Sequence, residues 1–473
     1  MPAGIATLVF AAGILGLFLL DRDPKSHTSK ALWIAVIWLS IAGSRSVGQW
    51  IGTLHGASIT DTTSDASAYT EGSPTDRLVY SGLLLAGLIV LVRRRQEVLG
   101  ILRANWPLVA FFLYCAVSVA WSDYPDVAFK RWIKALGDVV MVLIILTDRD
   151  RYAAIKRALA WTAFLLIPIS VLFIKFYPDL GRGYHPWIWT PYYTGVATNK
   201  NELGRLCLIL GLGVVWRIVT ALRSEQRAAR NMHLLAFGAC LAMVSWLLWM
   251  AGSMTSMSCF FMAGALMLAT SLRMVARKPW VVHVMVFAIL AASVTTLFLD
   301  MGSGVLQTMG RDPTLTGRTD IWKLVLGMAG NPVFGTGFES FWLGKRLEKM
   351  WSIYWWHPRE AHNGYLEMFL SLGWLGIVMF GIVLVTGYRT VVSAFRRNAE
   401  EGKLRLAYFT VAVAYNFAES AFGSLNLIWI CFLLATISVP GGWIKNKPRK
   451  AVAAVTKLAP PVVFHAWSEF DPA

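Results

Sequence analysis

Charged residues are scarce in this chain, and acidic residues are the scarcest. Asp, Glu, Lys and Arg make up 15% of its 473 residues, whereas a soluble domain carries about 25%. There are 27 acidic residues against 44 Lys and Arg. Together with 56% hydrophobic residues and a mean hydropathy of +0.54, this shortage excludes an ordinary soluble domain. The composition indicates a membrane protein.

Cysteine and the common ligand motifs are also sparse. The five cysteines lie in apolar segments without CxxC spacing, so we expect neither disulfides nor metal thiolates. His357, Glu360 and His362 were considered as zinc ligands, but Pro358 prevents a regular helix through them and no third ligand cluster is visible. Walker, GxSxG and strand-associated GxGxxG motifs are lacking. We therefore expect no metal and no cofactor.

Long apolar runs are abundant instead. A helix crosses a bilayer with about 20 mainly apolar residues, whereas barrel strands alternate in segments of about 10 residues. Leu234–Met250 and Val281–Leu299 are continuous apolar runs and favour helices. We predict twelve or thirteen spans, near residues 3–20, 31–51, 77–92, 105–121, 131–147, 158–176, 201–221, 233–251, 257–272, 280–299, 363–387, 404–419 and 423–442.

The predicted fold is all-α, a polytopic transmembrane helical bundle with one long, partly helical loop. Helices occupy residues 1–299 and 363–443, the loop occupies 300–362, and a basic tail occupies 444–473. Segment 3–20 lacks the basic start and the cleavage pattern of a signal peptide, so we expect it to stay as a helix.

The net charge of +17 records topology rather than affinity for nucleic acid. Lys and Arg cluster in alternate connections, within residues 22–30, 93–103, 149–157, 223–230, 273–278, 389–405 and 445–450. By the positive-inside rule these connections are cytoplasmic. Residues 52–76, which contain no Lys or Arg, and the 300–362 loop then lie outside.

Several cations lie on the predicted outer side, against this rule. They are Arg131, Lys134, Arg182, Lys200, Arg205, Arg311 and Arg318, with Asn201 on the helix face of Arg205. A charge near the bilayer centre costs about 2.5–3.5 kcal/mol and usually has a partner. These groups could pair with nearby carboxylates such as Asp138 or extend to lipid headgroups. As a set they predict an anion pocket, because the planar guanidinium of Arg suits the oxygens of a lipid-linked pyrophosphate.

His362 stands where the loop re-enters the membrane, and Asn363 is a suitable helix N-cap. A histidine that titrates near neutrality can accept a proton from an incoming hydroxyl group, which typically accelerates a reaction by about 10²–10⁴. The alternative is that His362 only caps the helix or anchors it at the interface. Position alone leaves both interpretations open.

Three stretches resemble the bacterial O-antigen ligases and the related polysaccharide polymerases, including the exopolysaccharide polymerase branch. They are His362-Asn363 followed by nine residues, Gly373, two residues and Gly376; Gly317–Trp322 with Asn331–Gly337; and, more weakly, Lys200–Gly204. The resemblance covers residues 195–380 well, and the remainder only through topology.

This resemblance implies a GT-C-like glycosyltransferase of the bacterial inner membrane that needs no metal and faces the periplasm. Its donor would be an undecaprenyl-diphosphate-linked glycan, with Arg318 holding the pyrophosphate and His362 activating the acceptor hydroxyl. From their positions, Arg311, Lys200 and Arg205 would help to balance the phosphate charge, and Glu419 would orient a partner residue. A ligase transfers to lipid A-core, whereas a polymerase transfers to another glycan repeat. The Gly310–Arg318 run looks closer to the exopolysaccharide polymerases, but the acceptor stays open.

Two other functions were weighed. A transporter or flippase for an anionic or lipid-linked solute could use the same arginines. Transporters often show internal repeats and charged groups near the midplane, and neither is clear in this chain. A non-catalytic scaffold would give Arg318 and His362 no purpose. Membrane lipid is an expected partner, and nucleic acid is not.

Overall fold

The computed structural model describes residues 1–23, 27–55, 72–184, 190–223, 226–276, 278–298 and 315–442. Within them the fold is helical apart from one short antiparallel ribbon of β1 (Arg182–Tyr184) and β2 (Pro191–Tyr193). The helices are α1 Ala3–Leu20, α2 Leu32–Ala42, α3 Val47–Leu54, α5 Pro74–Arg93, α6 Arg95–Ala104, α7 Trp106–Val117, η2 Ser118–Trp121, α8 Pro125–Leu146, α9 Arg151–Phe176, α10 Pro178–Gly181, α11 Lys200–Ala221, α12 Arg227–Ala251, α13 Met254–Ala269, α14 Arg273–Ala276, α15 Pro279–Phe298, α17 Leu315–Gly327, α18 Gly344–Ile353, α19 Gly364–Arg397, α20 Ala399–Ala418 and α21 Leu427–Thr436.

Each predicted span coincides with a helix or with consecutive helices. Six described helices, α1, α5, α9, α11, α12 and α19, are long and apolar enough to cross a membrane. A seventh span results if α6 and Trp106–Trp121, bent by 90°, count as one, and four further apolar helices are shorter. The all-α polytopic bundle is therefore confirmed, and twelve or thirteen spans stays a prediction.

Arg45 explains why one predicted span is broken. α2 ends at Ala42 and α3 begins at Val47. Between them the buried Arg45 guanidinium donates to the Leu180 carbonyl at 2.7 Å and to Thr194 at 3.2 Å. An unsatisfied charge inside the bundle would be costly, so the chain bends here to provide these partners.

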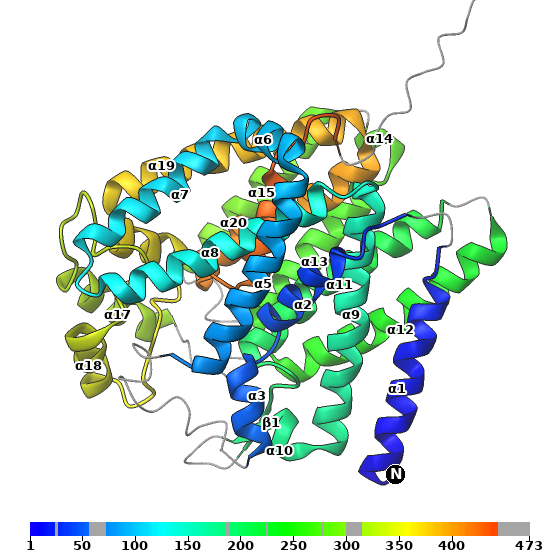
Figure 1. The fold of residues 1–473 in the computed structure, drawn as a ribbon, viewed down its shortest axis with the longest axis horizontal. Coiled ribbons are helices and arrows are strands. Elements are labelled where there is room, and N and C mark those ends of the chain that lie inside the picture. Colours follow the sequence, from blue (N-terminus) through cyan, green and yellow to red (C-terminus); the bar gives the residue numbers. More distant parts are fainter. Residues whose placement is uncertain are drawn as a thin grey trace, which may run out of the picture.

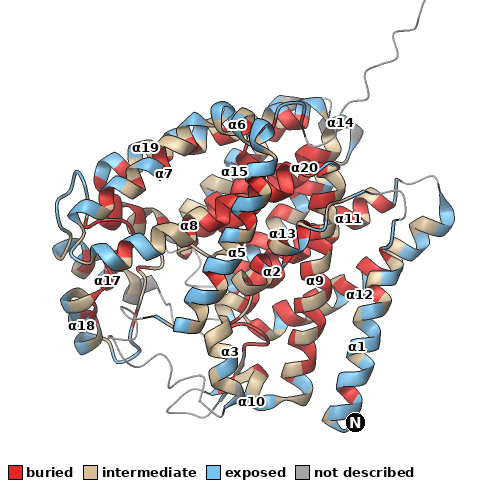
Figure 2. Ribbon diagram, viewed as in Figure 1, coloured by how far each residue is buried: buried red, intermediate tan, exposed pale blue. Residues whose placement is uncertain are grey.

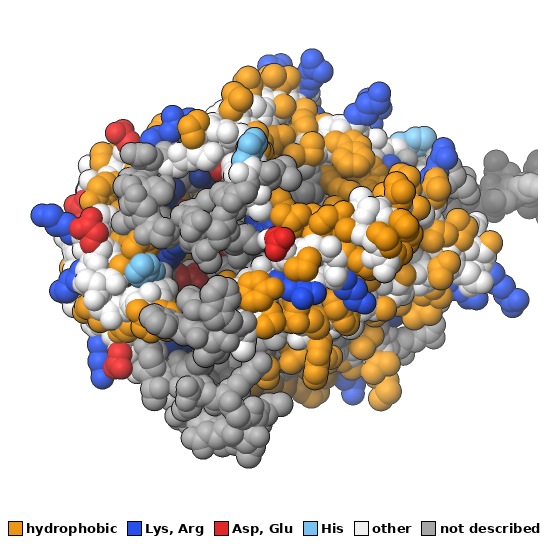
Figure 3. Space-filling model, turned by 90° about the horizontal axis from the view of Figure 1, so that it is seen from below, with side chains coloured by type: hydrophobic (Ala, Val, Ile, Leu, Met, Phe, Trp, Pro, Cys, Tyr) orange, Lys and Arg blue, Asp and Glu red, His pale blue; other side chains and the backbone are white. Residues whose placement is uncertain are grey.

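The most buried helices lie at the centre of the bundle. Figure 2 shows burial concentrated on α9, α11 and α20, whereas α1 at the edge is mostly exposed. α11 packs against α9, α12, α13 and α20. Figure 3, a view of one end of the molecule, shows hydrophobic side chains over much of the face, with Lys and Arg both at its edge and among them.

α17 and α18 lie beside the bundle, at the left of Figure 1 and far from α14. They belong to the predicted 300–362 loop, whose partly helical character is confirmed. The loop's residues 331–337 pack into a break in α19 at Gly373, which has φ 64°. Thr336 and Gly337 donate their N–H groups to the carbonyls of Leu370 and Ser371 at 3.1 and 2.9 Å.

Gly373 is required at this break. A Cβ there would lie 2.3 Å from the Val333 carbonyl oxygen, and its positive φ suits glycine. Gly373 therefore serves the close packing of the loop against α19. Because the loop replaces hydrogen bonds that a continuous helix would make, it sets the direction of the first part of α19, which starts beside His362.

Candidate active site

The site forms where the start of α19 meets the end of α20. Asn363 caps α19, since its Oδ1 accepts the N–H groups of Tyr365 and Leu366, both at 3.0 Å. The Gly364 N–H donates to the Glu419 carbonyl at 3.1 Å. This bond ties the start of one helix to the residue that ends the other, and so places His362 and Glu419 side by side.

His362 lies between two carboxylates. Its Nδ1 is 3.0 Å from Oε2 of Glu419 and 3.2 Å from Oε1 of Glu360. Glu419 is buried, with 8% of its side chain exposed, whereas Glu360 is 38% exposed. His362 also has φ 50°, an uncommon backbone conformation for a non-glycine residue, and such conformations cluster at functional sites.

Two cations reach the same region from other helices. Nη2 of Arg318, on α17, is 3.3 Å from Oε1 of Glu419. Nη1 of Arg205, on α11, lies 3.5 Å from the carbonyl of Ser420, the residue after Glu419. Four separate segments therefore bring Arg318, His362, Glu360, Glu419 and Arg205 together.

The protonation of this cluster follows from its charges. Burial lowers the pKa of His362, but hydrogen bonds to Glu360 and Glu419 and their negative charges outweigh it and raise the pKa from 6.5 to about 10. Burial raises the pKa of Glu419, but the hydrogen bond to His362 and the charges of His362, Arg318 and Arg205 lower it overall. At neutral pH His362 is therefore an imidazolium. The sequence-based prediction that it titrates near neutrality is wrong, because the residue pattern did not reveal both carboxylates.

Glu360, His362 and Glu419 also present donor atoms that lie within 4.8 Å of one another. Within the described part of the chain, Glu419 thus adds a third potential metal ligand to Glu360 and His362. Glu419 supplies it from 57 residues away. One nitrogen and two carboxylate oxygens suit a divalent ion such as zinc. However, the imidazolium of His362 and the guanidinium of Arg318 already compensate the carboxylate charges. That the enzyme needs no metal stays a prediction.

The remaining predicted residues are placed less centrally. Asn363 is a helix cap. Lys200 is exposed at the start of α11, and Asn201 follows it. Along the helix axis, Lys200 lies about 7.5 Å and Asn201 about 6 Å from Arg205. Among the contacts of the described residues, neither one reaches His362 or Glu419. Arg311 lies outside the described residues.

Three other outer-side cations have packing roles instead. Arg131 donates to the Glu339 carbonyl, the Lys134 ammonium lies 5.3 Å from the Tyr80 ring centroid, and Arg182 donates to the Ile174 carbonyl at 2.8 and 2.9 Å. That they join the anion pocket stays a prediction. Each one satisfies a local backbone or aromatic partner.

Sequence reasoning missed the aromatic support of the site. Trp322 donates its indole N–H to the carbonyl of Ala361, the residue before His362, at 2.8 Å. The Trp356 ring lies 6.2 Å from the His362 ring. Trp322 follows Arg318 by four residues on α17 and so shares its helix face. That spacing was the available signal.

A cavity of about 440 Å³ lies beside the loop that packs into α19. It is lined by Trp121, Asp123, Gly330, Asn331, Phe334, Gly335, Thr336 and Arg346. Trp121 and Phe334 are 36% and 43% exposed. Aromatic faces beside polar side chains are suited to a sugar ring.

Comparison with known proteins shows similarity to polysaccharide ligases and polymerases. Residues 238–381, which include Arg318 and His362, match the family model described as O-antigen ligase. The chain is also 27% identical over 320 residues to the exopolysaccharide production protein ExoQ of Rhizobium meliloti (strain 1021), covering 66% of this chain and 70% of that protein. The chain is therefore similar to the O-antigen ligases and to the related exopolysaccharide production proteins. Its apolar helices indicate a multi-pass membrane protein, and the similarity supports a polysaccharide-processing enzyme of the O-antigen ligase type. The matched O-antigen ligase segment ends before Glu419, so the contact to this carboxylate comes from outside it.

Proposed function

We propose that this enzyme transfers or polymerises an undecaprenyl-diphosphate-linked glycan at the periplasmic face of the bacterial inner membrane. One observation carries the proposal. The two oxygens of the buried Glu419 contact Arg318 and His362, so a phosphate-binding cation and a proton-transfer group share one carboxylate. The similarity to O-antigen ligases and to an exopolysaccharide production protein supports a glycan substrate that is linked to lipid.

Arg318 holds the diphosphate of the donor. Its side chain is 20% exposed and contacts Glu419 through Nη2, and a guanidinium has five N–H donors. Parallel hydrogen bonds to two phosphate oxygens are the geometry that Arg provides. Arg205, whose charge already acts on Glu419, adds a second cation. These cations stabilise the negative charge that develops on the leaving diphosphate.

His362 accepts the proton of the acceptor hydroxyl. Its Nδ1–H is held by Glu419, which leaves Nε2 for the hydroxyl, as in other carboxylate-oriented histidine bases. Nε2 must first release its own proton to water, and the half-exposed Glu360 raises the pKa of His362, which opposes this release. Displacement of Glu360 by the bound substrate lowers that pKa and makes the imidazole a base.

The bonds then exchange in one step. The hydroxyl proton moves to Nε2, the oxygen forms a bond to the anomeric carbon, and the carbon–oxygen bond to phosphate breaks with its electron pair on the diphosphate. Attack opposite the leaving group inverts the anomeric carbon. The cavity beside Trp121 and Phe334 accommodates sugar units of the glycan.

The acceptor proposed is another glycan repeat on lipid diphosphate, as in polymerisation. The similarity to an exopolysaccharide production protein supports this acceptor over lipid A-core. Incubation of the purified protein with a defined lipid-diphosphate repeat, with and without lipid A-core, tests it. Chain growth without core is expected, whereas transfer only to core would show ligation. Movement of the repeat across a membrane without any new glycosidic bond would instead show a flippase.

A further inference from the structure

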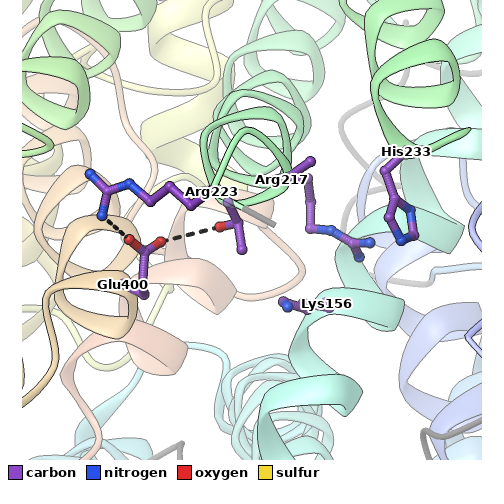
Figure 4. Close-up of a pocket in the computed structure, with 7 residues that line it drawn as sticks. Lys156, Arg217, Arg223, His233 and Glu400 are labelled. Carbon is purple, nitrogen blue, oxygen red and sulfur yellow. Dashed lines mark hydrogen bonds and ion pairs between the residues drawn. The ribbon is translucent and has the colours of Figure 1, made fainter. Parts of the chain in front are cut away.

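A second charged cavity lies at the opposite end of the bundle. It has a volume of about 390 Å³, and its lining residues are Lys156, Arg217, Thr220, Ala221, Arg223, His233 and Glu400. Figure 4 shows Lys156, Arg217 and His233 directed toward a common space, with Glu400 joined to Arg223 and Thr220 on its other side. The family comparison gives this cavity no role.

Two helices, α11 and α20, run from the candidate active site to this cavity, and their lengths give the separation of the two sites. On α11, Arg217 follows Arg205 by twelve residues, or about 18 Å of helix. On α20, Glu400 and Glu419 are nineteen residues and about 28 Å apart. The cavity therefore cannot share a ligand's phosphate with Arg318 and His362. It lies at the end that the charge pattern predicts to be cytoplasmic.

Positive charge exceeds negative charge around this cavity. Arg217 is 2.5 Å from Asp21, whereas Arg223 and Lys403 both contact Glu400. Lys156 contacts the Tyr152 ring, 4.0 Å from its ammonium, and no carboxylate within the described residues. Asp23 also acts on the charge of Lys156, so three carboxylates offset four cationic groups and leave an excess of one positive charge.

We propose that this cavity binds a phosphate group. A phosphate monoester carries a charge of about −1.5 to −2 at neutral pH, so the excess positive charge of the cavity attracts it. Lys156 and Arg217 are the principal donors. Arg223 stands at the mouth, because its side chain is 46% exposed whereas that of Arg217 is 9% exposed. The phosphate belongs either to an anionic lipid headgroup of the adjacent leaflet or to a soluble phosphate compound.

The test measures binding to the purified full-length protein in detergent, in an Arg318→Ala background that removes the proposed diphosphate contact. One arm titrates inorganic phosphate by calorimetry, and the other titrates phosphatidic acid by native mass spectrometry. Lys156→Gln should weaken binding by about tenfold, the effect of losing one charge-assisted hydrogen bond. Lys156→Arg should bind normally, as should the control Lys30→Gln, which alters an exposed lysine of the same predicted face.

Binding in either arm supports the site. Binding of inorganic phosphate indicates a soluble phosphate compound as the ligand, and binding of phosphatidic acid indicates a lipid headgroup. If Lys156→Gln lowers the thermal unfolding midpoint without ligand, a second pair of variants is used for the binding comparison. This pair is Arg223→Gln, with Arg227→Gln as its exposed control. The proposal is overturned if neither ligand binds, or if folded Lys156→Gln and Arg223→Gln bind as tightly as their controls. Because glycan transfer is not measured, failure here leaves the proposed reaction unaffected.

Discussion

Arg318 and His362 are joined through one carboxylate: Nη2 of Arg318 lies 3.3 Å from Oε1 of Glu419, and Nδ1 of His362 lies 3.0 Å from Oε2. This buried carboxylate offsets the guanidinium and orients the imidazole at the same time. Binding of a diphosphate to Arg318 would therefore act directly on the partner of the proposed base.

Glu419→Gln should reduce the transfer rate by about 10²–10⁴, the usual contribution of an acid–base group, because the amide neither orients His362 correctly nor balances Arg318. The rate of chain growth by the purified protein measures this effect. Glu348→Gln, an exposed acidic residue on α18, is the matched control and should be unchanged. A Glu419→Gln rate near that of the control would exclude the orienting role.

Glu360→Gln should shift the pH dependence of the reaction. A base works when deprotonated, so the native rate should rise with pH toward the His362 pKa of about 10. Glu360 raises that pKa, and its neutralisation should move the rising limb to lower pH. Profiles of kcat/KM between about pH 6 and 10 test the sign. An unchanged limb, or a shift to higher pH, would contradict the assigned influence of Glu360.

Arg318→Lys should recover little of the activity that Arg318→Ala abolishes, because an ammonium cannot make two parallel hydrogen bonds to phosphate oxygens. Surface polysaccharide on gels, from a strain lacking the native gene and with expression held constant, provides the comparison. Full activity of Arg318→Lys would show that charge alone suffices at this position.

Gly373→Ala should lower both the unfolding temperature and activity. The positive φ costs an alanine about 1–2 kcal/mol, and the new Cβ would lie 2.3 Å from the Val333 oxygen. Thermal unfolding of the purified protein measures the loss. Gly381→Ala in the same helix has no neighbour within 4 Å and should be tolerated. Equal behaviour of the two variants would show that the break does not depend on glycine.

Prior treatment with a chelator should leave the transfer rate unchanged, because Arg318 and Arg205 stabilise the leaving group without a divalent ion. The measurement compares rates after EDTA and after addition of Mg²⁺ or Zn²⁺. Loss of activity that zinc restores would instead show that Glu360, His362 and Glu419 bind a metal.

The sequence predicted the helical bundle well, because long apolar runs have a clear physical reason to cross lipid as helices. It also indicated His362, Arg318 and Glu419 as site residues. It did not predict the pairing itself, since His362 and Glu419 are 57 residues apart and only the packing of α19 against α20 joins them. The position of the break at Arg45 could not be predicted, because its partners, Leu180 and Thr194, lie far along the chain.

The most direct test of the account measures glycan transfer by the purified protein, with no other protein present, from a synthetic polyprenyl-diphosphate repeat. Mass spectrometry follows both the lengthened lipid-linked glycan and the released polyprenyl diphosphate. Native protein and His357→Ala, a change in the same loop, should form both products, whereas His362→Ala should form neither at a measurable rate. Native rates from His362→Ala would contradict the account.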